Sequence, residues 1–135
     1  MSMSSEAVEP RLEYMFQADV RVDQPLELGE FSGVRKRVIP IIGGEISGPR
    51  LAGQILAGGA DWQAIREDNV TEVLARYTVR AIDGTLISVT NRGVRRGPAE
   101  VIRRLLAGEA IDPALYYFRS TPVFGGPWSA SLARG

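Results

Sequence analysis

The segment over residues 70–92 constrains the fold more than any other part of the chain. Two runs rich in β-branched and aromatic residues flank Asp83-Gly84, a pair favoured in two-residue type I′ hairpin turns. With that turn, Arg76 lies opposite Asn91, and period-two alternation places both side chains on one face. Neither face of this hairpin is purely apolar, a mixture that a barrel with a partly polar cavity tolerates better than a two-sheet sandwich does.

Other segments add further strand patterns and one helix pattern. Strands are expected over residues 12–22, 26–28, 35–42, 51–56 and 115–121. Pro40 marks an edge strand or a bulge. A short helix is expected near residues 98–107, with Pro98 in its first turn and Gly108 after its end. Its apolar stripe consists of Val101, Ile102, Leu105 and Leu106. The predicted fold is therefore mainly β, a single antiparallel β-barrel with one short helix.

The length of 135 residues fits one domain. We expect residues 1–10 to form a disordered leader and residues 11–135 to form the single barrel domain. The leader is polar and acidic and lacks the apolar stretch of a secretory signal. No run approaches the ~20 apolar residues of a membrane-spanning helix. The sequence therefore predicts a cytoplasmic protein with no membrane partner.

Histidine and cysteine are both absent. Their absence excludes disulfides, zinc sites with thiolate or imidazole ligands, cysteine nucleophiles and Ser-His-Asp triads. The remaining chemistry uses carboxylates, arginine, tyrosine, hydroxyls, backbone groups or the single Lys36, and we expect neither a metal nor a cofactor. Because 16 basic residues balance 16 acidic ones, no net charge favours binding to nucleic acid.

Asp61 and Trp62 follow Gly58-Gly59 after a predicted strand. In one interpretation, Asp61 caps a turn and Trp62 closes the core. In the other, Asp61 lies at a cavity mouth against Trp62, where partial burial raises its pKa and suits it to general acid–base catalysis. The sequence leaves both interpretations open.

Arginine and tyrosine side chains are further candidates for ligand contacts. On an inward face, Arg76 beside Asn91 would bind a carboxylate, phenolate or enolate oxygen, whereas an outward Arg76 would be solvated. In the last strand, Tyr117, Arg119 and Thr121 share one face. That face either adds to a pocket or packs on the core with one exposed arginine.

Several short motifs resemble, in order and spacing, a bacterial and fungal family known as domain of unknown function 3237 or uncharacterised protein family 0311. The matching stretches are Leu26-Glu27-Leu28-Gly29, Gly43-Gly44, Gly48-Pro49-Arg50-Leu51-Ala52-Gly53, Gly58-Gly59-Ala60-Asp61-Trp62, Ala75-Arg76-Tyr77-Thr78, Asp83-Gly84-Thr85-Leu86-Ile87, Asn91-Arg92-Gly93 and Tyr117-Phe118-Arg119-Ser120-Thr121-Pro122. The resemblance covers residues 12–124 and implies a small barrel of the lipocalin or allene-oxide-cyclase kind, often self-associated, with a conical cavity. The cavity candidates that it carries over are Asp61, Trp62, Arg76, Asn91, Arg119 and Thr121.

The tail after residue 125 departs from the family, which usually continues with a closing strand. Without that strand, a barrel leaves unpaired edges that invite another chain to pair with them. We therefore expect a two-fold homodimer that buries an edge strand or the region of Trp128.

Together these features predict a barrel that binds a small molecule. We expect a cofactor-free isomerase, cyclase or lyase acting on an aromatic or oxygenated apolar metabolite. Asp61 would move a proton while Arg76, Asn91 and Arg119 stabilise the developing oxyanion. The alternatives are a non-catalytic ligand carrier and a self-associating structural module, so the sequence leaves open whether the chain is an enzyme.

Overall fold

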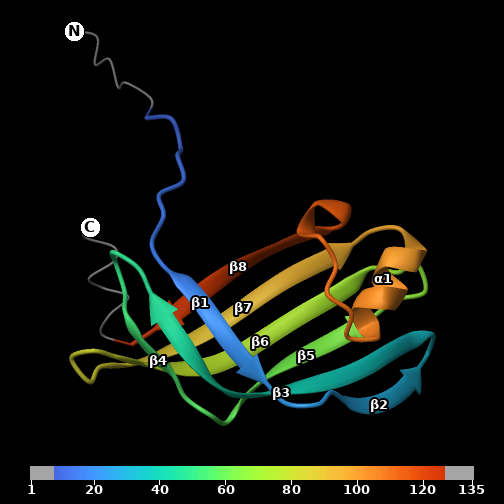
Figure 1. The fold of residues 1–135 in the computed structure, drawn as a ribbon, viewed down its shortest axis with the longest axis horizontal. Helices are drawn as coiled ribbons and strands as arrows, with labels where there is room; N and C mark the ends of the chain where they lie inside the picture. The colour runs from blue at the N-terminus through green and yellow to red at the C-terminus, as the bar shows by residue number, and fades with distance from the viewer. Residues whose placement is uncertain (1–7, 127–135) are drawn as a thin grey trace, which may run out of the picture.

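The computed structural model describes residues 8–126, which form one antiparallel sheet with one α-helix packed on it (Figure 1). The sheet has eight strands, which confirms the prediction of a mainly β chain with one short helix. The elements in chain order are β1 (Gln17–Val22), β2 (Leu26–Phe31), β3 (Val34–Ser47), β4 (Gly53–Ile55), β5 (Gly59–Ile65), β6 (Thr71–Ala81), β7 (Leu86–Arg96), α1 (Ala99–Leu106), the 3-10 helix η1 (Pro113–Leu115) and β8 (Tyr117–Gly125).

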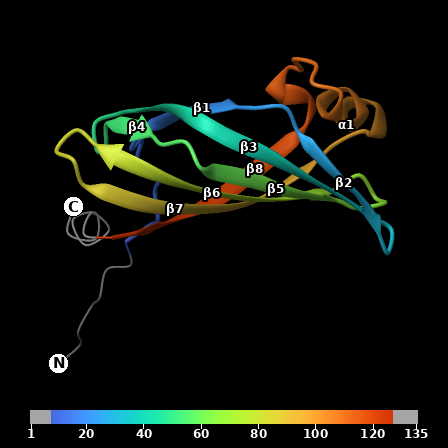
Figure 2. The same ribbon diagram turned by 90° about the horizontal axis from the view of Figure 1, so that it is seen from below.

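The long strand β3 organises the sheet. One side of β3 pairs with β2 and then with β1, and the other side pairs with β5 and then with β4. Strands β6, β7 and β8 continue the sheet, and within the described residues β8 does not pair with β1. Figure 2 shows the sheet folding over, so that β1, β3 and β4 lie above β6 and β7. The ring of Phe16, just before β1, and the ring of Phe124 on β8 meet edge to face between these two ends of the sheet, with centroids 5.9 Å apart. The architecture is an open barrel.

β3 runs through Gly43-Gly44 to Ser47, beyond the end predicted at residue 42. A side chain at Gly44 would collide with the backbone carbonyl of Asp19 on β1, so the close approach of the two strands requires glycine. A bulge also interrupts the pairing of β3 with β1, and bulges bend the strand that carries them. The two glycines therefore let the strand bend over the core without ending it.

Pro40 lies inside the sheet, where it pairs with Ala60 of β5. On its other side, the carbonyl of Pro40 accepts a hydrogen bond from Asp23 N–H at 2.9 Å, in the break between β1 and β2. The N and O atoms of one residue in an antiparallel strand point to the same side. The ring nitrogen of Pro40 therefore faces the gap between β1 and β2, where no strand needs a hydrogen-bond donor. Pro40 is tolerated because of this gap, and not because it lies on an edge strand of the sheet.

The turn between β6 and β7 contains residues 82–84, one residue more than predicted. Ala81 N–H donates to the carbonyl of Thr85 at 2.9 Å, and Asp83 Oδ1 accepts from Thr85 N–H at 2.9 Å. Gly84 adopts a φ of +89°, the left-handed conformation that ends a three-residue hairpin loop. The hairpin thus forms where the sequence predicts it, but with a longer turn.

The longer turn shifts the register of β6 against β7. Asn91 lies opposite Ala75, and Arg76 lies opposite Thr90. Directly opposed residues share a face, whereas successive residues alternate between faces. Arg76 and Asn91 therefore point to opposite faces, and the prediction that they are neighbours on the interior face is wrong. The physical reason is that a slip of one residue moves every side chain of a strand to the other face.

We call the face of the sheet that carries the hydrophobic core the inner face, and the opposite face the outer face. The inner face is apolar where β1 and β4 cover it. Its buried core contains Ile41, Ile46, Leu51, Ile55, Val79, Ile87 and Val89, with Phe16, Ala18, Tyr77, Ala81 and Phe124 packed against them. At the other end of the strands the inner face becomes polar, and α1 lies over it (Figures 1 and 2).

The helix α1 begins directly after Pro98 and covers this polar end, in agreement with the predicted position. Ile102 is 1% exposed, whereas Val101, Leu105 and Leu106 are half-buried. The predicted apolar stripe is therefore confirmed, with Ile102 as its only fully buried member. Neither helix in residues 8–126 has the length and apolarity needed to cross a membrane.

Candidate functional site

Six polar side chains lie together on the inner face beside α1, and we call them the inner polar cluster. They come from four strands, β3, β5, β6 and β7. The members are Arg37, Asp61, Gln63, Thr71, Asn91 and Arg95. Arg37 and Gln63 are each 6% exposed and Thr71 is fully buried. The other three members are half-buried, so the cluster is largely but not wholly closed to solvent.

The strand register explains how these side chains meet. Asp61 lies opposite Ala75, which in turn lies opposite Asn91. In the next row, Arg37 lies opposite Gln63, and this row continues through Val73 on β6 to Gly93 on β7. The small residues Ala75 and Gly93 leave room above the sheet that long side chains from neighbouring strands can enter.

Each member of the cluster carries a buried polar atom that has no hydrogen-bond partner among the described residues. These atoms are Arg37 Nε, Asp61 Oδ1, Gln63 Oε1, Thr71 Oγ1, Asn91 Oδ1 and Arg95 Nε. Buried polar atoms are nearly always paired, because an unpaired one costs about 1–3 kcal/mol. Six unpaired atoms in one cluster indicate a region built to contact something other than itself.

The environment of Asp61 in this cluster changes the pKa of its carboxyl. Burial raises the pKa of its carboxyl above the usual value, although Gln63 Nε2 donates to Oδ2 at 3.0 Å and the guanidinium groups of Arg95 and Arg37 act in the opposite direction. Desolvation of the charged form therefore outweighs the stabilising neighbours. A carboxyl with a raised pKa and an unpaired Oδ1 suits general acid–base catalysis.

The two guanidinium groups of the cluster are held differently. Arg37 Nη2 lies 2.8 Å from Glu27 Oε1, and Arg37 Nη1 lies 3.4 Å from the carbonyl of Leu106 at the end of α1. Burial lowers the pKa of Arg95 below its usual value, while the negative charge of Asp61 acts in the opposite direction. Arg95 remains cationic at neutral pH, so both groups can stabilise negative charge beside Asp61.

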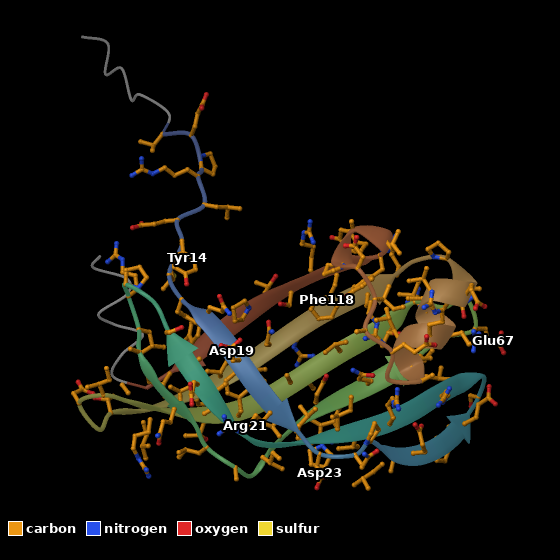
Figure 3. All side chains as sticks on the ribbon, viewed as in Figure 1. Tyr14, Asp19, Arg21, Asp23, Glu67 and Phe118 are labelled. Atoms are coloured by element: carbon orange, nitrogen blue, oxygen red, sulfur yellow. The ribbon has the colours of Figure 1, made fainter. Side chains whose placement is uncertain are left out.

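The inner face is uncovered toward β8. Phe118 and Ser120 lie opposite Arg95 and Gly93 on β7 and so share the inner face, yet both are exposed. Figure 3 shows Phe118 at β8, between β1 and α1. The inner face therefore reaches solvent on the β8 side of the cluster. Within residues 8–126 no group of three or more acidic side chains is placed to hold a metal ion.

The structure separates the predicted site residues onto two faces. Asp61 and Asn91 belong to the inner polar cluster, as predicted. The outward residues are Trp62, Arg76, Tyr117, Arg119 and Thr121, whose cross-strand partners place them on the outer face. The predicted shared cavity for all seven is therefore wrong, because alternation along β5 turns Trp62 away from Asp61 and the shifted register turns Arg76 outward.

The face shared by Tyr117, Arg119 and Thr121 neither enters the inner cluster nor packs on the core. Tyr117 is 47% exposed, and the guanidinium of Arg119 lies 5.3 Å from the centre of its ring. Arg119 Nη1 also donates to the carbonyl of Phe118 at 2.7 Å. Arg119 is thus held at the surface by a cation–π contact and one hydrogen bond.

Four members of the inner polar cluster were not predicted from the sequence, namely Arg37, Gln63, Thr71 and Arg95. Gln63 follows Asp61 by two residues, and Arg95 follows Asn91 by four. Residues separated by an even number of positions on one strand share a face, so the sequence contained enough information to predict that Gln63 lies beside Asp61 and that Arg95 lies on the face of Asn91. Arg37 comes from a strand distant in sequence, and only the pairing of β3 with β5 brings it to Asp61.

Sequence similarity assigns the chain to a family. The family described as "Protein of unknown function (DUF3237)" matches residues 10–129. The chain belongs to this family. The match confirms the resemblance found in the sequence motifs. A member from Rhodopseudomonas palustris, "UPF0311 protein RPA1785", is 41% identical over 117 residues, which cover 85% of this chain and 76% of that protein.

Solved structures agree with this family assignment. The crystal structure of the Rhodopseudomonas palustris protein matches with a TM-score of 0.83 and 40% identity, covering 92% of this chain and 84% of that one. A "beta-barrel like protein" from Acinetobacter baumannii matches with a TM-score of 0.66 and 32% identity, covering 91% of this chain and 85% of that one. A structure described as an enzyme from Penicillium herquei matches with a TM-score of 0.59 and 25% identity, covering 69% of this chain and 72% of that one. These three solved structures therefore share the fold of this chain.

Proposed function

We propose that the inner polar cluster binds an aromatic or oxygenated apolar metabolite and that Asp61 moves a proton on it. The observation that carries this proposal is the carboxyl of Asp61, whose pKa is raised by burial and whose Oδ1 is unpaired among the described residues. Two guanidinium groups flank this carboxyl without forming a hydrogen bond to it. Asp61 is therefore free to exchange a proton with a ligand.

The chemistry follows from the charges around the carboxylate. Asp61 accepts a proton from an acidic C–H or O–H of the ligand, and the electron pair left behind moves onto a carbonyl or phenol oxygen. Arg95 and Arg37 stabilise the resulting enolate or phenolate, and the amide of Asn91 orients it. Return of the same proton to a different atom completes an isomerisation. In a cyclisation, the oxyanion first forms a bond to one carbon of a conjugated C=C of the same ligand, the π bond breaks, and the electron pair that it releases takes up the proton from Asp61. No electron leaves the ligand, so this reaction needs no cofactor.

The alternatives are a non-catalytic carrier and a self-associating structural module. A structural cluster would satisfy its own hydrogen bonds, as the pair Asp61–Gln63 and the pair Arg37–Glu27 do. The unpaired atoms on all six members argue against that alternative. The similar structure from Penicillium herquei is described as an enzyme, which favours catalysis over simple carriage.

Proton exchange tests this function before a product is known. We would screen phenols, aromatic carboxylates and 1,3-dicarbonyl compounds for an increase in Tm, since binding to the folded state stabilises it. Each compound that binds would then be incubated in D2O, and deuterium incorporation would be followed by NMR. The wild type should accelerate the exchange, and Asp61→Asn should abolish the acceleration while compounds still bind.

The matched control is Asp19→Asn, which removes an exposed carboxylate on β1. This variant should exchange deuterium at the wild-type rate. Binding without accelerated exchange by the wild type would support the carrier instead, and the absence of any bound compound would support the structural module.

A further inference from the structure

The outer face carries positive charge that the inner polar cluster does not use. The outward-facing basic residues of β3, β6, β7 and β8 are Lys36, Arg76, Arg80, Arg92, Arg96 and Arg119. Among the outward-facing residues of β3 and of β5 to β8, the carboxylates are those of Glu45, which lies 3.9 Å from Arg21, and Glu72, which pairs with Arg66 at 3.2 Å. The chain has no net charge, so this face is positive because its charges are segregated.

Most of these cations lack a partner of opposite charge. The guanidinium groups of Arg96 and Arg119 lie over the ring of Tyr117, at 5.6 and 5.3 Å from its centre. For Lys36, Arg76, Arg80 and Arg92, no carboxylate of the described residues lies within 4.0 Å. A bound anion would therefore meet cations that no ion pair has already neutralised.

Arg76 and Arg92 are diagonal neighbours across β6 and β7. Arg92 lies opposite Leu74, and Arg76 lies two residues farther along the same strand as Leu74. Diagonal partners in a sheet lie about 7–8 Å apart, within reach of long side chains, and like charges at such positions repel. An anion placed between the two guanidinium groups would remove this repulsion and accept hydrogen bonds from both.

Trp62 stands beside this pair of arginines. It lies opposite Leu74 on the outer face, and it is 43% exposed. Two hollows meet at Trp62, of about 430 and 280 Å³. Arg92, Lys36 and Glu72 line the larger hollow, and the carboxylate of Glu72 is paired with Arg66. The smaller one is lined by Arg76 together with the hydroxyl residues Thr78, Ser88 and Thr90.

We propose that this part of the outer face is a second binding site, for a planar aromatic anion. The aromatic ring stacks on Trp62, and the anionic group lies between Arg76 and Arg92 with the nearby hydroxyls as additional donors. The larger hollow, of about 430 Å³, has the size of a small-molecule pocket, which spans about 300–1,000 Å³, and the smaller one adjoins it at Trp62. The sheet itself separates this site from the inner polar cluster, so the proposal does not depend on the function proposed for Asp61.

A titration with 2-naphthoate, a planar aromatic carboxylate, tests the site. Calorimetry with the full chain should show one saturable site whose affinity falls as salt is added. Arg76→Gln and Arg92→Gln should each weaken binding by about tenfold or more, because each removes a charged donor. Trp62→Leu should weaken it by a similar factor, and 2-naphthamide, which has the same shape without the charge, should bind about tenfold less tightly.

Two control variants locate the probe. Arg80→Gln removes an outward arginine that does not line either hollow, and it should leave the affinity within about twofold. Asp61→Asn alters the inner polar cluster and should also leave the affinity unchanged.

Four outcomes would overturn the proposal. The first is the absence of saturable binding, and the second is an affinity that survives both Arg76→Gln and Arg92→Gln. In the third, a single-stranded oligouridylate binds at a lower concentration than 2-naphthoate does and prevents 2-naphthoate from binding, which would make the face a nucleic-acid surface. In the fourth, Arg76→Gln converts a dimer into a monomer in sedimentation, which would make the face a subunit interface.

Discussion

Asp61 on β5 and Asn91 on β7 lie in one cross-strand row, with only the methyl group of Ala75 between them. Each of the two side chains has a buried oxygen that is unpaired among the described residues. The row therefore combines two polar groups with a small residue in the middle, the arrangement expected where a ligand enters between them.

Enlarging the central residue of this row should close it. Ala75→Leu places three more carbon atoms between the carboxyl and the amide, and overpacking of this kind costs about 1–3 kcal/mol of the free energy of unfolding. Any compound that raises the Tm of the wild type through the inner cluster should lose its effect. Denaturant unfolding and thermal shift measure the two results. Ala107→Leu, at an exposed position after α1, is the control and should change neither.

Asp61→Asn should change how stability depends on pH. Because the folded-state pKa of Asp61 is raised, the folded wild type retains a proton that the unfolded chain has lost, and its stability falls as pH rises through the folded pKa. Asparagine does not titrate. The variant should therefore gain stability relative to the wild type between acidic and neutral pH, by about 1.4 kcal/mol for each pKa unit of the shift. Unfolding titrations at several pH values measure this difference.

Asp68→Asn is the control, because the pKa of Asp68 is lowered where that of Asp61 is raised, and its effect on the pH dependence of stability should therefore have the opposite sign. Hydrogen bonds from Arg66 and from Val70 N–H lower the pKa of Asp68. The stability that they contribute is present above the unfolded pKa and is lost as pH falls through the folded pKa. This variant should be less stable than the wild type at neutral pH and equal to it in acid. The same pH trend for both aspartates would contradict the environment described for Asp61.

Removing the buried residue of α1 should destabilise the fold. Ile102 is 1% exposed, and truncating such a side chain to alanine costs about 2–5 kcal/mol. Leu105 is only half-buried, so Leu105→Ala should cost less than Ile102→Ala. Arg103→Ala, which removes an exposed side chain, should stay within about 0.5 kcal/mol of the wild type. Equal losses for Ile102 and Leu105 in urea unfolding would contradict this packing of the helix.

We propose that the chain forms a homodimer through the edge of β8 around Val123. Among the described residues, β8 pairs only with β7, and its outward Val123 is 65% exposed. Such edges invite a second chain to pair with them. Val123→Lys should weaken the dimer, because charged side chains at an edge oppose pairing. The predicted contribution of Trp128 concerns a position outside the described residues.

Sedimentation velocity at micromolar concentration measures the association. The wild type should sediment with twice the mass of the chain, and Val123→Lys should shift it toward the monomer. A wild type that remains monomeric would contradict the dimer and would indicate that the edge of β8 is protected within one chain.

Much of the fold was predictable from local sequence patterns. Alternation identified the hairpin of β6 and β7, and the apolar stripe with Gly108 after it identified α1. Gly108 indeed adopts a left-handed φ of +86°, which glycine permits at the end of a helix. The continuation of β3 through Gly43-Gly44 was not predictable in this way, because the glycines are required by the approach of β1, a strand far away in the sequence.

The candidate site divides along the same line. The sequence by itself determined that Asn91 would lie on a strand of a hairpin and that Asp61 would follow a glycine pair beside a strand, but it left open whether Asp61 caps a turn or is partly buried. Only the tertiary structure decided which face each candidate occupies and that Arg37 and Arg95 join Asp61. The reason is that a strand alternates its side chains, so one extra residue in the turn at Gly84 reverses the faces of Arg76 and Asn91 relative to each other. Neither face of that hairpin is purely apolar, so hydrophobicity could not select the register, and packing of the whole sheet selected it instead.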